Sequence, residues 1–263
     1  MDDELRTSLW NVINLMFFDT NVTTLNRTVR LYRVAIDAQL NFFKKPIDDL
    51  PEYVYQYKKI VRSWFFSAKW FEIYDFVEFL RNCLKDENWN QHNPNYIFSE
   101  QFGSTINNAL EREKSAYRFI GEHLSPIIEA PEIKAIEDAT ESDDRFDGAR
   151  QHIRTALQLY SDRKSPDYRN SVKEAISAIE SASCIIANDP KATLGQALKT
   201  IERVHKIHPA MVNAFDRLYG YASNSGGIRH AMLEEENVSE EEARFMLVAC
   251  SAFLNFLASL TKA

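Results

Sequence analysis

The sequence predicts an all-α protein built from two helical domains, and three observations support this class. Along most of the 263 residues, apolar side chains recur at the three- and four-residue spacing of amphipathic helices. Apart from the short run PEYVYQY at 51–57, no segment alternates apolar and polar residues over the length of a strand. Aromatic usage is uneven, since all four Trp and 12 of the 17 Phe lie before residue 140, which indicates two different cores.

The boundary between the two domains is predicted near residue 140. Between 130 and 152 the sequence APEIKAIEDATESDDRFDGARQH replaces apolar periodicity with acidic, small and Gly residues, as linkers do. We therefore divide the chain into residues 1–140 and 141–263. The helices expected in the first domain span roughly 3–18, 26–43, 52–67, 70–84, 100–123 and 130–139.

Two of these helices carry matching aromatic faces. The helix that begins at Trp70 has an apolar face, and the helix near residue 60 has another. The two faces consist of Ile73, Phe76, Val77 and Leu80, and of Val61, Trp64 and Phe65. Such a stripe could bind bases or a ring-shaped ligand, but packing in a core is the commoner use and is the one we expect here.

The second domain is predicted to be a bundle of five amphipathic helices. Four of them span roughly 148–162, 166–187, 192–204 and 208–222, and the last opens with a capping box of Ser239 and Glu242. Ser165 and Pro166 suit the N-cap and first position of the second helix, and Pro209 suits the start of the fourth. At 100° per residue, the buried stripe of the 166–187 helix comprises Val172, Ile176, Ile179 and Ser183, with Arg169, Lys173 and Glu180 along one edge.

Composition and charge restrict the functional class. The net charge of −7 argues against a broad binding surface for nucleic acid or an anionic membrane, although it leaves room for a local basic pocket. The N-terminus MDDELRTSLW is acidic where a signal peptide is basic, and the longest apolar stretch, 245–260, is interrupted by polar residues and is short for a membrane span. We expect a cytoplasmic protein that does not bind membranes, with Cys83, Cys184 and Cys250 reduced.

The stretch YGYASNSGGIRHAMLEEENVSEEEARF, 219–245, holds the strongest candidate site. Gly226 and Gly227 permit close backbone approach just before Arg229 and His230. Arg holds phosphate through its planar fork, and His exchanges a proton near neutral pH. Consecutive helical side chains diverge by about 100°, so one pocket would need help from another helix or subunit. Arg169 and Glu180 are the candidates for that help.

A structural reading of the same residues stays open. Arg229 could pair with Glu180 or with an acid of the 234–242 run, while His230 caps or packs. The sequence contains no P-loop, no GxGxxG and no GxSxG motif, so nucleotide hydrolysis, dinucleotide redox chemistry and serine hydrolysis are poorly supported. We expect no metal and no cofactor.

Several long phrases resemble a known family. SLWNVINLMFFD, FFKKPIDDLP, WFEIYDFVEFL and LEREKSAYRFIGEHLSPI look like an AbiJ-type N-terminal domain, a module of bacterial abortive-infection and related antiphage proteins. PDYRNSVKEAISAIES, DPKATLGQALK, HPAMVNAFDRLYGYAS and GGIRHAMLEE look like the HEPN-like C-terminal domain that often follows it. The resemblance implies a helical bundle that is commonly a homodimer and often a metal-independent ribonuclease in toxin or phage-defence systems.

The resemblance also identifies where this chain departs from the family. The active HEPN motif has an Arg four to six residues before its His, which matches His230, but those positions are occupied by Gly226, Ser225 and Asn224. Asn224 matches the polar residue that often follows the Arg. If the chain cleaves RNA, the resemblance implies that His230 assists proton transfer in the attack of a 2′-hydroxyl, while Arg229 and Arg169 stabilise the phosphoryl oxygens.

Two hypotheses follow from these patterns. The first is an RNA-cleaving antiphage effector whose N-terminal domain senses a phage or regulatory trigger, or restrains the nuclease. The second is a non-catalytic helical module that recognises a protein partner, a nucleotide or RNA. An enzyme needs its Arg and His side chains to converge in an accessible pocket, whereas a binding module can bury them as ion pairs.

Overall fold

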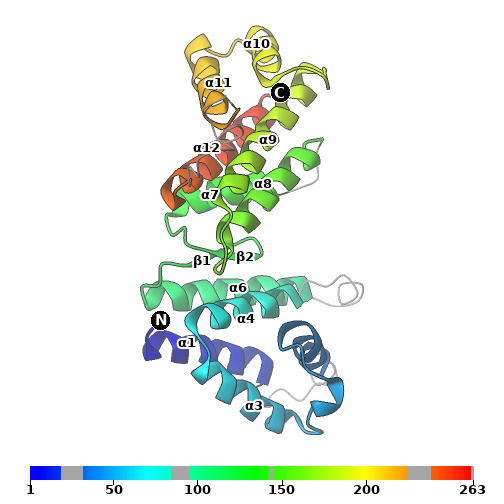
Figure 1. Ribbon diagram of the computed structural model, residues 1–263, viewed down its shortest axis with the longest axis vertical. Coiled ribbons are helices and arrows are strands. Elements are labelled where there is room, and N and C mark those ends of the chain that lie inside the picture. The colour runs from blue at the N-terminus through cyan, green and yellow to red at the C-terminus, as the bar shows by residue number, and fades with distance from the viewer. Residues whose placement is uncertain (19–31, 84–94, 142–144, 224–237, 262–263) are drawn as a thin grey trace, which may run out of the picture. The chain divides into compact units, whose positions relative to one another are not determined.

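The computed structural model describes residues 1–18, 32–83, 95–141, 145–223 and 238–261 (Figure 1). The described chain is mainly helical, as predicted, and its contacts divide it into two compact units, residues 1–126 and 127–263. The predicted boundary near residue 140 lies further along the chain than this division. The difference concerns the segment 127–140, which packs within the second unit.

Within the described residues, unit 1 contains the helices that the first half of the sequence predicts with one exception, and the helix predicted over 130–139 belongs to unit 2. Residues 32–37 are also helical and lead into a π-helical turn. The remaining elements of this unit that begin before residue 113 are α1 (Asp3–Ile13), η1 (Asn14–Phe18), η2 (Ala38–Phe42), η3 (Ile47–Asp49), α3 (Val54–Ser67), α4 (Trp70–Cys83) and α6 (Asn95–Arg112).

The core of unit 1 is rich in aromatic rings. The faces predicted for α3 and α4 are confirmed, since Val61, Phe65, Ile73 and Val77 are at most 1% exposed. The indole of Trp64 meets the ring of Phe76 edge to face, with ring centroids 5.1 Å apart. Aromatic pairs in this geometry add to the hydrophobic contribution of the buried area. The rings therefore serve as core residues, which is the use expected for this stripe.

The exception is the helix predicted over 100–123. The helix α6 ends at Arg112, and a β-hairpin follows, formed by β1 (Arg118–Ile120) and β2 (His123–Ser125). Lys114 adopts a left-handed conformation with φ of 54°, which stops the helix. The amide of Ser115 then donates to the carbonyl of Leu110 at 2.8 Å, closing the helix end in a Schellman-type pattern.

Side chains of two helices hold the hairpin in place. The side-chain carbonyl of Asn107 in α6 accepts a 2.7 Å hydrogen bond from the amide of Phe119 in β1. The carboxylate of Glu78 in α4 accepts one of 2.7 Å from the amide of Leu124 in β2. The two strands pair antiparallel through a two-residue turn whose Gly121 has φ of 54°. These helix contacts stabilise a hairpin that would be marginal alone.

Unit 2 is a helical bundle. Its elements are α7 (Ala130–Thr140), α8 (Asp147–Ser161), α9 (Tyr168–Ala187), α10 (Leu194–His205), α11 (Pro209–Ser223) and α12 (Glu240–Ser259). In Figure 1, α8, α9 and α12 lie side by side, and α9 also contacts α10 and α11. The capping box of Ser239 and Glu242 and the start of α11 at Pro209 are confirmed.

The start of α9 differs from the prediction. Asp167 is the N-cap and its carboxylate accepts from the amide of Asn170 at 3.0 Å, so the helix begins at Tyr168 rather than at Pro166. Ser165 belongs to the preceding loop, because its amide donates to the carboxylate of Asp162 at 3.0 Å. Because Asp167 is the N-cap, the first helical residue is Tyr168, two residues after the predicted start at Pro166.

The last helix is the most apolar of the described helices. By length and composition alone α12 could cross a membrane, and among the described helices it is the one that meets this test. Half of its apolar window is buried within the unit, where it contacts α7, α8 and α9. Its apolar character is therefore accounted for by its position in the core of unit 2.

Candidate functional site

The predicted site residues divide into two groups. Asn224, Arg229 and His230 lie outside the described residues, so their geometry stays a prediction. Arg169 and Glu180 are both on α9, and both are half-buried. The structure therefore shows the position of Arg169 and Glu180, on the helix α9 that packs against α8 and α12.

The spacing of these two side chains limits what they can do together. Arg169 and Glu180 are eleven residues apart, which places them within about 20° of one another around the helix but roughly 16 Å apart along it. The buried stripe next to them is confirmed, because Val172, Ile176, Ile179 and Ser183 are all at most 4% exposed. A group the size of a phosphate could not touch both side chains of one α9. In one subunit, the two residues would have to serve different parts of a ligand.

A histidine and glutamate pair lies on the facing sides of α8 and α9. The Nδ1 atom of His152 is 2.6 Å from Oε2 of Glu174, and the two side chains are 40% and 32% exposed. A carboxylate on Nδ1 fixes the orientation of an imidazole and leaves Nε2 available to exchange a proton. The two residues are 22 positions apart, so no short motif announces them. The pair is thus a His–Glu contact between two helices that the sequence patterns did not identify.

Metal binding has no support in the described parts of the chain. No group of three or more His, Cys, Asp and Glu side chains comes close enough there to hold a metal ion. The most buried thiol, Cys250, is 1% exposed, and burial raises its pKa to about 12. A thiol in this state is protonated and unreactive at neutral pH.

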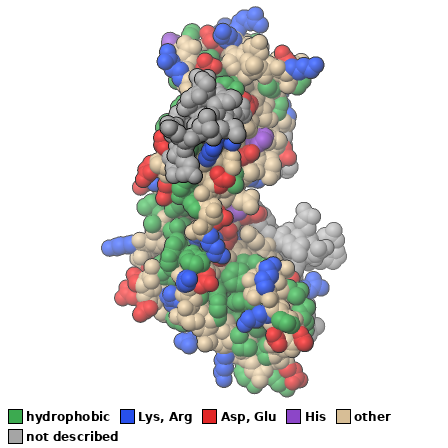
Figure 2. Space-filling view, viewed as in Figure 1, with side chains coloured by type: hydrophobic (Ala, Val, Ile, Leu, Met, Phe, Trp, Pro, Cys, Tyr) green, Lys and Arg blue, Asp and Glu red, His purple; other side chains and the backbone are tan. Residues whose placement is uncertain are grey.

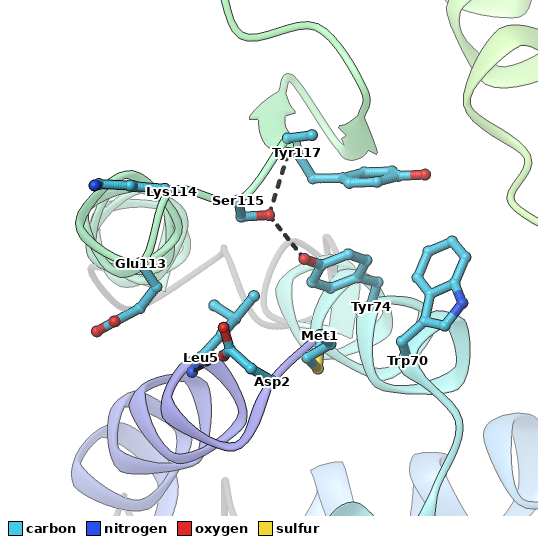
Figure 3. A pocket seen from close by; sticks show the side chains of 10 residues that line it. Met1, Asp2, Leu5, Trp70, Tyr74, Glu113, Lys114, Ser115 and Tyr117 are labelled. Atoms are coloured by element: carbon cyan, nitrogen blue, oxygen red, sulfur yellow. Dashed lines mark hydrogen bonds between the residues drawn. The ribbon is translucent and has the colours of Figure 1, made fainter.

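Unit 1 contains a cavity of about 370 Å³ beside the end of α6 (Figure 3). Its walls come from the start of α1, the start of α4 and the segment that follows α6, and they include Met1, Asp2, Leu5, Trp70, Tyr74, Glu113, Lys114, Ser115, Ala116 and Tyr117. In Figure 3 the rings of Trp70, Tyr74 and Tyr117 stand together on one side. This volume is within the range that small ligands occupy.

The polar groups of this cavity are held by the protein itself. The hydroxyl oxygen of Ser115 lies 2.8 Å from the hydroxyl of Tyr74 and accepts a 3.2 Å hydrogen bond from the amide of Tyr117. The carboxylate of Glu113 accepts from the hydroxyl of Ser8 at 2.7 Å and from Nε of Arg112 at 2.9 Å, and these bonds lower its pKa. The Asp2 carboxylate caps α1. The cavity therefore offers ring faces more readily than charge to a ligand.

Comparison with known proteins identifies a family for the first part of the chain. The family described as AbiJ N-terminal domain 4 matches residues 1–142, which is more than half of the chain. No curated protein matches the chain, and no solved structure matches it. The matched segment contains all of unit 1, its aromatic core and its cavity, together with α7 of unit 2.

Proposed function

The chain belongs to the AbiJ N-terminal domain 4 family of abortive-infection proteins, and from this membership we propose that it is an antiphage effector whose second unit is a HEPN-type ribonuclease. The family match is the observation that carries the proposal. Unit 2 adds support, because it is a helical bundle of the kind that such a nuclease uses. In this proposal unit 1 senses the trigger or restrains the nuclease, and the protein acts in the cytoplasm.

The proposed chemistry needs no metal ion. His230 transfers a proton as the 2′-hydroxyl of RNA attacks the neighbouring phosphorus and the bond from that phosphorus to the 5′-oxygen breaks, which leaves a 2′,3′-cyclic phosphate and a protonated 5′-hydroxyl. Arg229 stabilises the charge that develops on the phosphoryl oxygens. Asn224 contributes a polar contact to the RNA. Arg169 reaches the same phosphate or the next one, whereas Glu180, about 16 Å away along α9, contacts a different part of the strand.

The proposed active form is a homodimer that pairs through the C-terminal bundle. If Arg229 and His230 sit consecutively in a helix, their side chains point about 100° apart, so a second copy is the simplest source of the missing side of the pocket. A second α9 would also bring a second Arg169 toward the site. A dimer-breaking change should then abolish cleavage without unfolding either unit.

A non-catalytic binding module is the second candidate. One observation favours it, because none of the residues four to six positions before His230 is Arg; they are Gly226, Ser225 and Asn224. In that case the same surface recognises a protein partner, a nucleotide or RNA, and no bond is broken. The departure affects the charge-stabilising residue, so it bears directly on the rate of cleavage.

The test is cleavage of mixed tRNA and single-stranded RNA by the purified protein in EDTA. His230→Ala and Arg229→Ala should abolish cleavage, and His208→Ala at the exposed start of α11 is the matched control. His152→Ala tests whether the His152–Glu174 pair, rather than His230, supports cleavage. If only His152→Ala removes activity, the nuclease has another active site, and if neither wild type nor variants cleave RNA even in phage-infected cells, the binding module is supported.

A further inference from the structure

The outward face of α3 carries an unusual set of side chains. Tyr55, Lys59, Arg62 and Phe66 follow one another at i, i+4, i+7 and i+11. At 100° per residue they fall within about 60° around the helix, so they form one stripe. We call these four residues the α3 stripe. The buried residues of the same helix, Tyr57, Val61 and Phe65, point away from it into the core.

Rings and cations alternate along the stripe. Tyr55 is 57% exposed and Phe66 is 37% exposed, which is a large apolar area for the solvent side of a helix. The ammonium of Lys59 lies 5.7 Å from the centroid of the Tyr55 ring, and the guanidinium of Arg62 lies 4.9 Å from that of Phe66. These cation–π contacts hold each ring and its cation as neighbours.

The rings at both ends are supported by further contacts. The ring of Phe66 meets the indole of Trp10 at 6.1 Å and the ring of Phe65 at 5.9 Å, so it packs against the core although the residue is 37% exposed. At the other end Tyr53 stacks on Tyr55, with centroids 5.8 Å apart and planes inclined by 26°. The two rings of the stripe are therefore held in place by the protein and have little conformational freedom to lose when a base stacks on them.

The charge of this helix stands out against the rest of the chain. The helix contains Lys58, Lys59 and Arg62 and no acidic residue, whereas the whole chain carries a net charge of −7. In Figure 2 hydrophobic, basic and acidic side chains are interspersed over the lower part of the molecule, where α3 lies in Figure 1. A local positive potential on an acidic protein selects an anionic partner at this face.

We propose that the α3 stripe binds single-stranded nucleic acid. Base faces stack on aromatic rings, and phosphates pair with Lys and Arg, which is the combination that sequence-tolerant single-strand binding uses. An incoming base takes the place of the cation on the ring face, and the released ammonium or guanidinium moves to the adjacent phosphate. A duplex hides its base faces, so it could use only the cations of the stripe.

An anionic membrane fits this face less well. A membrane-surface helix keeps its basic residues on one face and its apolar residues on the other. Here the rings and the cations share one stripe, and Tyr57, Val61 and Phe65 of α3 are already buried in unit 1. The inference does not depend on RNA cleavage, because a chain that cleaves nothing could still bind a strand at α3.

Fluorescence anisotropy with labelled single-stranded RNA and DNA oligonucleotides of about 12 nucleotides tests the proposal. The full chain carrying His230→Ala is the reference protein, so that cleavage cannot consume the RNA. Removing one ring, with Tyr55→Ala or Phe66→Ala, should weaken binding at least about fivefold and leave the salt dependence unchanged. Lys59→Ala with Arg62→Ala should reduce the magnitude of the slope of log K against log salt by about 1.4, for two lost phosphate contacts.

Lys199→Ala with Arg203→Ala is the matched control, since it removes the same charge from exposed positions of α10 in the other unit. Phe66→Trp should retain binding because it keeps a ring. The proposal is overturned if neither strand binds, if the α3 variants bind as the control does, or if vesicles containing anionic lipid bind to the same stripe more tightly than the oligonucleotides. None of these results alters the outcome of the cleavage assay, so the two proposals fail separately.

Discussion

Gly103 in α6 is the position where one added methyl group tests the packing of unit 1 most directly. A Cβ atom there would lie 2.7 Å from Cζ and 2.9 Å from Nε of Arg81. Arg81 is 5% exposed, its guanidinium lies 4.6 Å from the centroid of the Phe119 ring, and its Nη2 atom is 3.2 Å from the Glu100 carboxylate. The guanidinium is thus confined between the backbone of α6 and the hairpin.

Gly103→Ala should destabilise unit 1 by about 1 kcal/mol. If the guanidinium stays, overpacking costs about 2 kcal/mol. If it moves away, loss of the cation–π contact and of the ion pair with the half-exposed Glu100 costs about 1 kcal/mol each. Either cost is offset by the higher helix propensity of Ala, which contributes about 1 kcal/mol. The melting temperature should fall by roughly 4 °C.

Thermal and urea unfolding followed by circular dichroism measure this change. Gly148→Ala in α8 is the matched control, because its Cβ would meet only the Ser181 hydroxyl at 3.9 Å, and it should stabilise unit 2 by up to about 0.5 kcal/mol. In an Arg81→Met background the close contact is relieved, so Gly103→Ala should become stabilising there. Equal destabilisation in both backgrounds, or no destabilisation in the wild type, would refute the reasoning.

Four further outcomes are expected. Arg150→Met should lower the free energy of unfolding by about 2 kcal/mol, measured by urea denaturation, because the buried guanidinium donates to the carbonyls of the last turn of α7. Lys206→Gly should raise the melting temperature of unit 2 slightly, since Lys206 ends α10 with φ of 54° at a cost of about 1 kcal/mol. Cys250 should resist alkylation in the native protein at neutral pH and react only on unfolding, as mass spectrometry would show, because burial raises its pKa to about 12. Burial also raises the pKa of Tyr160 above its ordinary value, so this phenol adds no pH dependence to the free energy of unfolding below about pH 10. Above that pH the free energy of unfolding falls, because the phenol ionises in the unfolded chain before it does in the folded one. An ultraviolet titration of the wild type beside Tyr160→Phe measures the ionisation of this phenol.

Helix starts were predictable where a local signal decides them. The capping box of Ser239 and Glu242 and the Pro209 start need only a few adjacent residues, and both are confirmed. At the start of α9, Ser165 and Asp167 are alternative N-caps, and the Asp167 carboxylate is the one that caps the helix. Sequence spacing could not rank them, because Ser165 and Asp167 are both good N-caps.

The hairpin was missed because its signals are atypical. Helices commonly end at Gly in the left-handed conformation, but this chain has 7 Gly and ends α6 with Lys114. The strands are three residues long and are stabilised by Asn107 and Glu78, which lie on helices 12 and 46 residues away from their partners along the chain. Neither contact leaves a trace in a short sequence window, so apolar periodicity alone extended the helix through the turn.

The candidate site was predictable only in part, for a similar reason. Motif spacing identifies residues that are near in sequence, such as Arg229 and His230, and their roles stay predictions. The pair of His152 and Glu174 arises from the antiparallel packing of α8 on α9, which no local spacing encodes. Helical periodicity did place Arg169 and Glu180 on one edge of α9. The separation along the helix axis, roughly 16 Å for eleven residues, keeps them from sharing a phosphate.

The helix α7 shows why sequence and contacts divide this chain at different places. The family match extends to residue 142 and so includes α7, while the contacts assign α7 to unit 2. Its last carbonyls accept hydrogen bonds from Arg150 and Arg154, and its Glu132 pairs with Arg244 of α12. The polar groups at the end of a helix must be satisfied wherever they lie. Because unit 2 satisfies those of α7, the segment that belongs to the family by sequence is part of the second unit by packing.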